Sequence, residues 1–512
     1  SVDGTHAAVQ RALRRLGWAA AATGADDPAP PPEAWELLWS YPYPFKHRKE
    51  ALAGLGRGQL VNHLPGHGAL TSKRELGKVS AELPFLPATF VLSARNASQD
   101  QGAALEAFAR AHPGVRWLLK GVDHRGVRPA GDVASPERRR EILAGLEPGQ
   151  AEVLVQQAID PLLVEGKMFD VGLYVAVTSL EPLRVYRFDP NLLVRFCREP
   201  YAAPGPGVDP AAYVVSGDYL PPWAASKALH RMYSENFSSR TALAAAVEMW
   251  GGNWDALEAR MEQAVLQLLV KQRPKMVRHV VKYPKRGAHF FQLVRFDFLV
   301  DKELRPWLVE ANASPNLNPS QHPELQPMYD RVALDLLSLL GLAPGGYRHA
   351  NASEPDGPTF AGLAQLASPR DLEARQCMGC FSKVCSSARC MPCHACRIGS
   401  DTSELLRLVE ENYARRGYVR IHPSSRHNEM MRELQWPEAP DAGEPPRVDA
   451  VPMHWVDHKC REDAAFCGVM PVETPGSESE DDADYEYAED YSEDFSDSDI
   501  VIDFTSSKAK ST

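Results

Sequence analysis

The sequence contains no run of 18 or more apolar residues, and its first residues include no basic segment followed by an apolar core. A helix that spans a bilayer needs about 20 consecutive apolar residues, so no membrane span is expected in this chain. A targeting segment is expected to be either absent or already removed. The length of 512 residues, with 44% hydrophobic and 24% charged residues, is typical of a globular protein with about three domains.

The chain also lacks an excess of basic charge. Its formal net charge is −11, and residues 477–512 alone carry 13 acidic and 2 basic groups, so the rest of the chain is balanced. We therefore expect no nucleic-acid partner, although a balanced chain can still form local basic patches. Residues 473–499 interleave acidic groups with Ser, Gly and Tyr and hold almost no aliphatic side chains. This composition predicts a disordered acidic tail over residues 471–512.

Composition and hydrophobic spacing divide the remaining chain into four segments. They are a short helix with a Pro-rich linker (1–32), a mixed α/β domain (33–345), a linker (346–370) and a Cys-rich C-terminal region (371–470). Strands are expected within residues 115–120, 152–156, 171–178 and 183–188. The clearest predicted helix covers residues 254–270 behind Asn253 as N-cap, and another begins at Asp401.

The most informative segment runs from Phe290 to Pro315. Two apolar stretches flank a polar turn at residues 301–303, a pattern that predicts an antiparallel hairpin. Glu310 and Asn312 are two residues apart on the second strand, so they share a face, and Asp297 on the first strand can lie opposite them. Two carboxylates and an amide oxygen in apolar surroundings favour a Mg²⁺ site, and a buried salt bridge is the alternative.

The same segment resembles the final signature of the tubulin tyrosine ligase-like family, which is built on an ATP-grasp fold. Other blocks agree with the family in the same order, and they cover about residues 38–345. These blocks lie at residues 60–73, 86–92, 117–120, 155–164, 174–186 and 193–196. The resemblance implies three lobes with mixed sheets, in which ATP lies between the central and C-terminal sheets.

The resemblance also implies roles for individual residues. Lys120 would contact the ATP phosphates, and Arg195 would lie near the transferring phosphoryl group or the acceptor. Asp297, Glu310 and Asn312 would hold Mg²⁺. The nucleotide would further be bound by Gln156, Gln157, Ala158, Ile159, Lys167 and Asp170.

Two residues depart from the family pattern Lys-Phe-Asp-Leu-Arg. Met168 stands in the place of the lysine and Gly172 in the place of the arginine. Lys167 could substitute only from the adjacent position, which faces the other side of a strand. Two functions therefore stay open: an active ligase, and a nucleotide-binding pseudoenzyme or microtubule-associated adaptor.

The family members join an amino acid to a protein carboxylate through an acyl phosphate. The resemblance thus implies tubulin or another acidic-tailed protein as substrate, with glutamate as the expected amino acid. A cytoplasmic location, associated with the cytoskeleton or the cilium, is the expectation.

Six of the nine cysteines lie between residues 377 and 396. Cys377, Cys380, Cys393 and Cys396 form two Cys-x₂-Cys pairs with the spacing of zinc ligands. Disulfides in an oxidising compartment are the alternative. Asn-x-Ser sequons at Asn96, Asn236, Asn312 and Asn351 keep that secretory alternative open.

Overall fold

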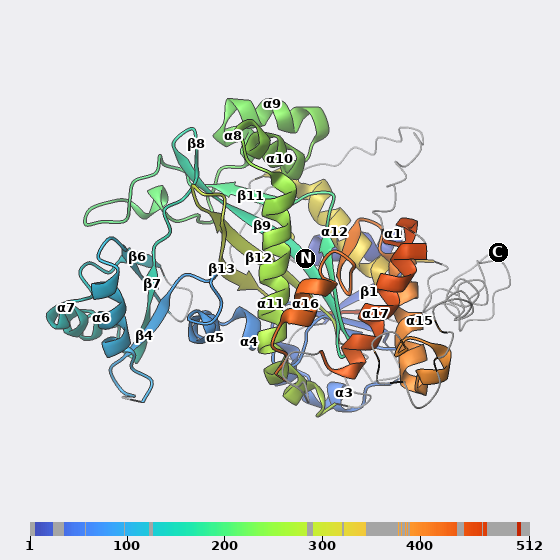
Figure 1. Cartoon of the computed structure of the whole chain (residues 1–512). Coiled ribbons are helices and arrows are strands. Elements are labelled where there is room, and N and C mark those ends of the chain that lie inside the picture. The colour runs from blue at the N-terminus through green and yellow to red at the C-terminus, as the bar shows by residue number, and fades with distance from the viewer. Residues whose placement is uncertain are drawn as a thin grey trace.

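The computed structural model describes most of the chain outside the linkers and the acidic tail. The described residues are 6–23, 35–56, 58–96, 98–121, 126–283, 290–319, 322–344, 377, 380, 385, 387, 390–437, 445–462, 464–467 and 499–502. Their strands form three sheets, which belong to three lobes as the ATP-grasp resemblance implies (Figure 1). Within these residues, no helix combines the length and the apolar character needed to cross a membrane.

The N-terminal lobe is built on a four-stranded sheet in the order β1-β15-β2-β3. Its strands are β1 (Ala20–Thr23), β15 (Asp499–Ile502), β2 (Leu37–Ser40) and β3 (Leu60–Val61). Its helices are α1 (Ala7–Arg15), α2 (Pro44–His47), α3 (Lys49–Ala53), α4 (Gly68–Thr71) and α5 (Lys73–Val79). Strand β15 corrects one expectation, because residues 499–502 of the acidic tail pair with both β1 and β2.

The predicted N-terminal helix is confirmed, but it is not a detached segment. Helix α1 buries Val9 and Leu13 in a cluster shared with α12 (Gln326–Leu339). Arg11 on its polar side forms an ion pair of 2.7 Å with Asp330 of α12. The N-terminal residues are therefore part of the folded body.

The central lobe is a four-stranded sheet in the order β4-β7-β5-β6. Its elements are β4 (Thr89–Ser93), α6 (Gly102–Ala111), β5 (Trp117–Lys120), β6 (Val127–Pro129), α7 (Pro136–Ala144) and β7 (Glu152–Gln157). Residues alternate along β5, so Trp117 and Leu119 are buried while Lys120 stays partly accessible. The lysine thus lies at the end of a strand whose other face belongs to a small apolar core.

The C-terminal lobe contains the largest sheet, in the order β13-β12-β9-β10-β14, with β8 and β11 also paired to β9. Its strands are β8 (Leu163–Val164), β9 (Lys167–Leu180), β10 (Leu183–Phe188), β11 (Leu193–Phe196), β12 (Gln292–Val300), β13 (Pro306–Asn312) and β14 (Tyr418–His422). The predicted hairpin is β12 and β13. Strands β9 and β10 carry apolar side chains on both faces, and α11 covers one face and α12 the other (Figure 1).

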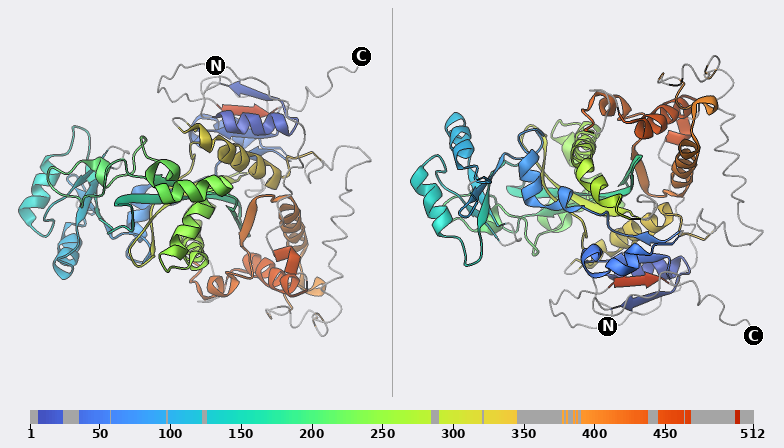
Figure 2. Two further views of the ribbon diagram at one scale, coloured as in Figure 1. Left: turned by 90° about the horizontal axis from the view of Figure 1, so that it is seen from above. Right: turned by 90° about the horizontal axis from the view of Figure 1, so that it is seen from below.

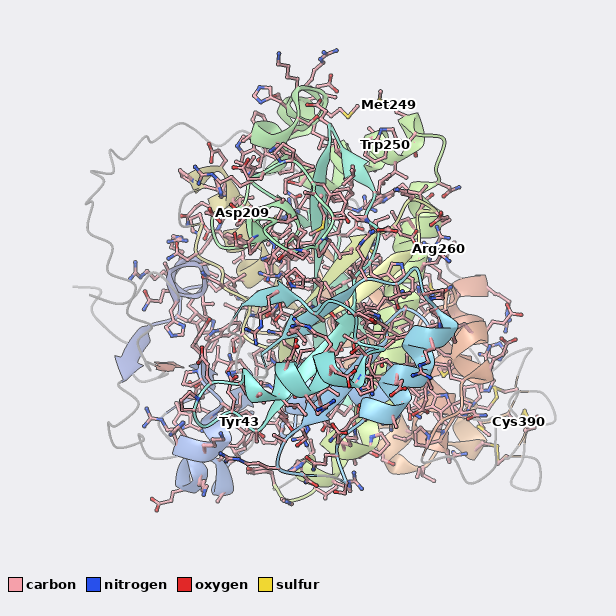
Figure 3. All side chains as sticks on the ribbon, turned by 90° about the vertical axis from the view of Figure 1, so that its left-hand side faces the viewer. Tyr43, Asp209, Met249, Trp250, Arg260 and Cys390 are labelled. Carbon is pink, nitrogen blue, oxygen red and sulfur yellow. A yellow bond between two sulfur atoms is a disulfide. The ribbon has the colours of Figure 1, made fainter. Side chains whose placement is uncertain are left out.

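Helix α11 (Trp254–Val280) is longer than the sequence predicts, and it contains Pro274. Asn253 caps it as expected, since its Oδ1 accepts a 2.8 Å hydrogen bond from the Ala256 N–H. Three further helices precede it: α8 (Pro222–Ala225), α9 (Lys227–Asn236) and α10 (Ser239–Met249). Met249 and Trp250 lie at the outer end of α10, where they are 71% and 42% exposed (Figure 3).

The Cys-rich region is attached to the C-terminal lobe and is not a separate module. It contributes β14, which pairs with β10, and the helices α15 (Gly399–Ala414), α16 (Asn428–Glu433), α17 (Arg447–Glu462) and α18 (Ala464–Cys467). Figure 2 shows this region and the N-terminal lobe on opposite sides of the large sheet. The expected boundary at residue 371 lies outside the described residues, and the described part of this region packs on the C-terminal lobe.

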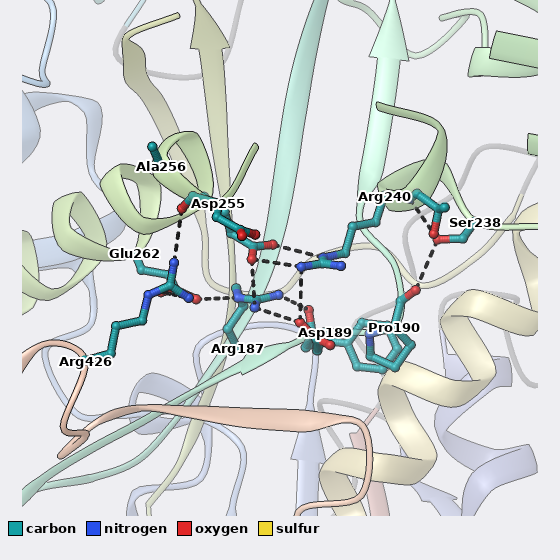
Figure 4. A network of polar contacts seen from close by, with 12 residues as sticks. Arg187, Asp189, Pro190, Ser238, Arg240, Asp255, Ala256, Glu262 and Arg426 are labelled. Atoms are coloured by element: carbon teal, nitrogen blue, oxygen red, sulfur yellow. Dashed lines mark hydrogen bonds and ion pairs between the residues drawn. The ribbon is translucent and has the colours of Figure 1, made fainter. Parts of the chain in front are cut away.

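A buried ion-pair network joins the lobe to this region (Figure 4). Arg187 of β10 contacts Glu262 of α11 and Asp189, each at 2.7 Å, and it lies 3.3 Å from Glu258. His427, which precedes α16, lies 2.7 Å from the other oxygen of Glu262. These groups satisfy one another inside the protein, as buried charges must.

The zinc interpretation of the cysteines is wrong, because the structure pairs them as disulfides. Cys377 bonds to Cys393, Cys380 to Cys390 and Cys385 to Cys396, and a fourth bond joins Cys460 to Cys467. A thiolate is required to bind zinc, and a disulfide sulfur has none. Within the described residues, no three His, Cys, Asp or Glu side chains come together as a metal-ligand group.

Candidate active site

The three predicted metal ligands lie side by side on the hairpin. Asp297 of β12 pairs directly with Glu310 of β13, and Asn312 lies two residues further along the same strand. A bulge follows Asp297, between it and Phe298. Asp297 is buried, whereas the Glu310 side chain is 31% exposed. The alternation of the two strands thus brings the set together as the sequence predicts.

Asp297 is the most heavily bonded member of this set. Its carboxylate accepts hydrogen bonds of 2.6 Å and 2.9 Å from Arg295, one of 3.0 Å from Arg195 and one of 2.9 Å from the Asn312 amide. Burial alone would raise the pKa of Asp297, but the two guanidinium groups outweigh it and the pKa is lowered. Asp297 is therefore an ionised carboxylate held between two arginines.

Arg195 links Asp297 to Asp170 across the sheet. It lies on β11 opposite Asp170 of β9, and it donates hydrogen bonds of 3.0 Å and 2.7 Å to that carboxylate. Its guanidinium also lies 5.9 Å from the centre of the Tyr219 ring. Burial raises the pKa of Asp170, and Arg195 opposes that rise only in part. Asp170 thus positions Arg195 in this structure.

Two lysines, Lys73 of α5 and Lys120 of β5, face Glu310. The Lys73 Nζ lies 3.4 Å from Glu310 Oε1, and Lys120 is close enough to Glu310 to interact with it electrostatically. Burial lowers the pKa of Lys120 to about 8, an effect that Glu310 opposes. A small cavity of about 10 Å³ is lined by both lysines, by Thr89 and Gln156 of the central sheet and by Leu308 of β13.

The residues expected to line adenine continue from β7. Gln156 Nε2 donates a 2.9 Å hydrogen bond to Thr89 Oγ1, and Gln157 Oε1 accepts a 3.3 Å bond from the Ala88 N–H. The Ala158 N–H is bonded to the Arg116 carbonyl at 2.8 Å, and Ile159 follows as a partly buried residue. Of these four residues, Gln156 lines the cavity, and the other three follow it along the chain.

Lys167 is not brought into this group. Lys167 begins β9, its Nζ donates to the Arg198 carbonyl, and its strand position faces away from that of Asp170. Met168, in the place of the family lysine, is buried. The structure therefore offers no lysine from this segment to the site.

Two residues of the site were missed by sequence reasoning. Arg295 lies two residues before Asp297 on β12, so the period of a strand already placed both on one face. Lys73 belongs to a block that resembles the family, but it begins helix α5 and no local pattern connects it to Glu310. The first could have been found from spacing, whereas the second needed the fold.

Of the three predicted ligands, Glu310 and Asn312 fit Mg²⁺ better than Asp297 does. Glu310 has a partly exposed carboxylate and Asn312 an amide oxygen, and such oxygens suit a hard cation. Asp297 accepts four hydrogen bonds, about as many as a carboxylate can take. Glu310 and Asn312 are therefore the residues that could hold a metal, whereas Asp297 is engaged by arginines.

A nucleotide would need more space than this arrangement provides. Ligand pockets usually measure about 300–1,000 Å³, far above the 10 Å³ of the cavity between Lys120 and Leu308. The cavity lies between the central sheet and β13. A ligand of nucleotide size would therefore enter this cavity only if the central sheet and β13 separated.

Comparison with known proteins gives a consistent result. The sequence model of the Tubulin-tyrosine ligase family matches residues 54–346 of this chain. The chain is 27% identical over 439 residues to the probable tubulin polyglutamylase ttll-15 of Caenorhabditis elegans, covering 85% of this chain and 79% of that protein.

Two further relatives are longer proteins. They are the tubulin polyglutamylase ttll6 of Danio rerio (26% identity, 65% of this chain and 41% of that protein) and the human tubulin polyglutamylase TTLL5 (25% identity, 76% of this chain and 31% of that protein). The chain thus spans less than half of either protein. The matched region includes the central lobe, most of the C-terminal sheet and every residue of the candidate site, and the chain belongs to the tubulin-tyrosine ligase family.

Proposed function

We propose that this protein is an ATP-dependent ligase that adds glutamate to carboxylates in the acidic C-terminal tails of tubulin. The observation that carries the proposal is that Lys73 and Lys120 line the cavity and interact with Glu310, which lies on the hairpin beside Asp297 and Asn312. Membership of the family and three relatives named as tubulin polyglutamylases support it.

In this proposal an acceptor carboxylate attacks the γ-phosphorus of ATP and releases ADP. The glutamate amine then attacks the acyl carbon, phosphate leaves, and an amide bond remains. Such transfers depend mainly on positioning and on charge stabilisation. Lys73 and Lys120 are the cations that face the phosphates, and Arg195 is the cation that faces the transferred group.

The remaining residues position these charges. Asp170 orients Arg195, and the segment from Gln156 to Ile159 lines the base. Glu310 and Asn312 are the residues that would hold Mg²⁺. When bound, this ion would neutralise phosphate charge during transfer.

A nucleotide-binding pseudoenzyme is the second candidate, and one observation favours it. Asp297 accepts four hydrogen bonds from Arg195, Arg295 and Asn312, so this predicted ligand is engaged without a metal. A protein of this kind would bind nucleotide between its lobes and join no amino acid to tubulin.

The test is mass spectrometry of tubulin after incubation with the purified chain, Mg-ATP and one amino acid at a time. We expect the tails to gain whole glutamyl residues with glutamate and to gain no mass with glycine or tyrosine. The Glu310→Gln variant is the control, since it keeps the side-chain volume and removes the charge. No mass increase with any amino acid, together with retained ATP binding, would favour the pseudoenzyme.

A further inference from the structure

The side chain of Arg295 on β12 lies over Gly172 on the neighbouring strand β9. Gly172 of β9 pairs with Asp297 of β12, and Arg295 lies two residues along β12 on the same face. A Cβ atom added to Gly172 would lie 2.9 Å from Cδ of Arg295, 3.2 Å from its Cγ and 3.1 Å from Asp297 Oδ1. The Arg295 side chain therefore fills the space that a side chain at position 172 would need.

The backbone does not explain the glycine. Gly172 lies within an extended strand and is not among the glycines with positive φ. Any residue could adopt this conformation, and apolar residues occupy both neighbouring positions, Val171 and Leu173. This position has no space for a side chain, because the Arg295 side chain fills that space.

Arg295 also places its charge at the centre of the site. Its guanidinium forms two hydrogen bonds with Asp297, at 2.6 Å and 2.9 Å, and Asp297 in turn contacts Arg195 at 3.0 Å. A diagonal neighbour on an adjacent strand lies about 7–8 Å away, within reach of an arginine side chain. An arginine at position 295 of β12 can therefore place its guanidinium group where an arginine at position 172 would place its own.

We infer that Arg295 replaces, from the neighbouring strand, the arginine that the family pattern has at position 172, and that Gly172 is the space that allows it. The inference rests on the proposed ligase function. On this inference, the glycine at position 172 does not indicate that the protein has lost ligase activity. Arg295 acts as a positioning residue, because it holds Asp297 and, through it, Arg195 in the geometry that phosphoryl transfer needs.

The test exchanges the two residues in the full chain. We compare the parent with Arg295→Gly, with Gly172→Arg and with the double variant Gly172→Arg/Arg295→Gly. The readouts are kcat and KM for ATP in glutamate ligation, together with the unfolding temperature. Arg295→Lys, which keeps the charge but loses the forked geometry, is measured in parallel.

We expect Arg295→Gly to lower kcat about 100-fold or more with a less than about threefold change in KM for ATP. Gly172→Arg alone should lower stability and activity, since two arginines compete for one space. The double variant should recover kcat to within about tenfold of the parent. Arg295→Lys should recover part of the stability and little of kcat.

Arg240→Met is the matched control, because Arg240 bonds Glu258 at 2.9 Å and 2.8 Å in the network outside the site. It should lower the unfolding temperature and leave kcat of the folded protein unchanged. A double variant as inactive as Arg295→Gly, or an Arg295→Gly protein with parental kcat, would overturn the inference. A parent without ligase activity would instead overturn the proposed function, and this inference with it.

Discussion

The protein contains two clusters of arginines and carboxylates on one sheet, and they differ in what surrounds them. The cluster around Arg187 is sealed by α11 and by the segment before α16, and its charges contact one another (Figure 4). The cluster around Arg195 has the same chemistry, but it adjoins Asn312, the partly exposed Glu310 and two lysines at a cavity. Burial and ion pairing are thus shared by a structural and a candidate catalytic cluster.

The difference shows what marks a site in this fold. Arg187 is 4% exposed and has three carboxylate partners, so its charge is neutralised by groups of the protein itself. Arg195 is 16% exposed and shares Asp297 with a second arginine. A shared carboxylate beside further cations at a cavity is the arrangement that can accept an anionic substrate.

The largest expected effect separates the two clusters directly. Arg187→Met should lower the free energy of unfolding by about 3–5 kcal/mol, because it leaves buried carboxylates without their cation. Arg195→Met should cost less stability and should reduce ligation about 100-fold or more. Denaturant unfolding and initial rates of glutamate incorporation, measured on both variants, provide the check. The opposite pattern would exchange the roles assigned to the two clusters.

The next effect concerns the disulfides of the Cys-rich region. Opening Cys380–Cys390 by changing both residues to Ser should cost about 2–4 kcal/mol. The unfolding temperature should fall while the shift produced by Mg-ATP persists. Thiol titration of the unfolded, non-reduced parent should find one free thiol, that of Cys197. Nine free thiols would contradict the pairing.

These outcomes also bear on what the sequence could predict. The hairpin and the set Asp297, Glu310 and Asn312 were predictable, because strand alternation fixes which side chains share a face. The Asn253 cap was equally local. Arg295 carries the same two-residue signal as Glu310 and Asn312, but this spacing alone does not distinguish it from an ordinary strand residue.

The rest depended on contacts between distant segments. Residues 418–422 read as a short strand only once β10 is known to lie beside them. The strand at residues 499–502 follows an acidic stretch whose composition predicts disorder, and it needs β1 and β2 as partners. The cysteine spacing suits zinc and disulfides equally, so only the paired sulfurs distinguish the two.

The smallest expected effect is a pH dependence at Lys120. Its pKa of about 8 means that the lysine is charged below pH 8 and neutral above it. Phosphates favour the charged form, so binding of ATP above pH 8 must take up a proton, and the Kd should rise by up to about tenfold per pH unit. Titration calorimetry at pH 7, 8 and 9 provides the measurement. Lys120→Arg, whose charge does not titrate in this range, should bind with a nearly constant Kd.

The central claim, that this sheet face binds Mg-ATP through Glu310, is tested most directly by thermal stabilisation. A ligand stabilises the native state according to its occupancy, so millimolar Mg-ATP should raise the unfolding temperature of the parent clearly. In Glu310→Gln the amide keeps the volume and loses a negative ligand, and the shift should disappear while the fold remains. Equal shifts in parent and variant would contradict the assignment of Glu310, and no shift in the parent would contradict nucleotide use altogether.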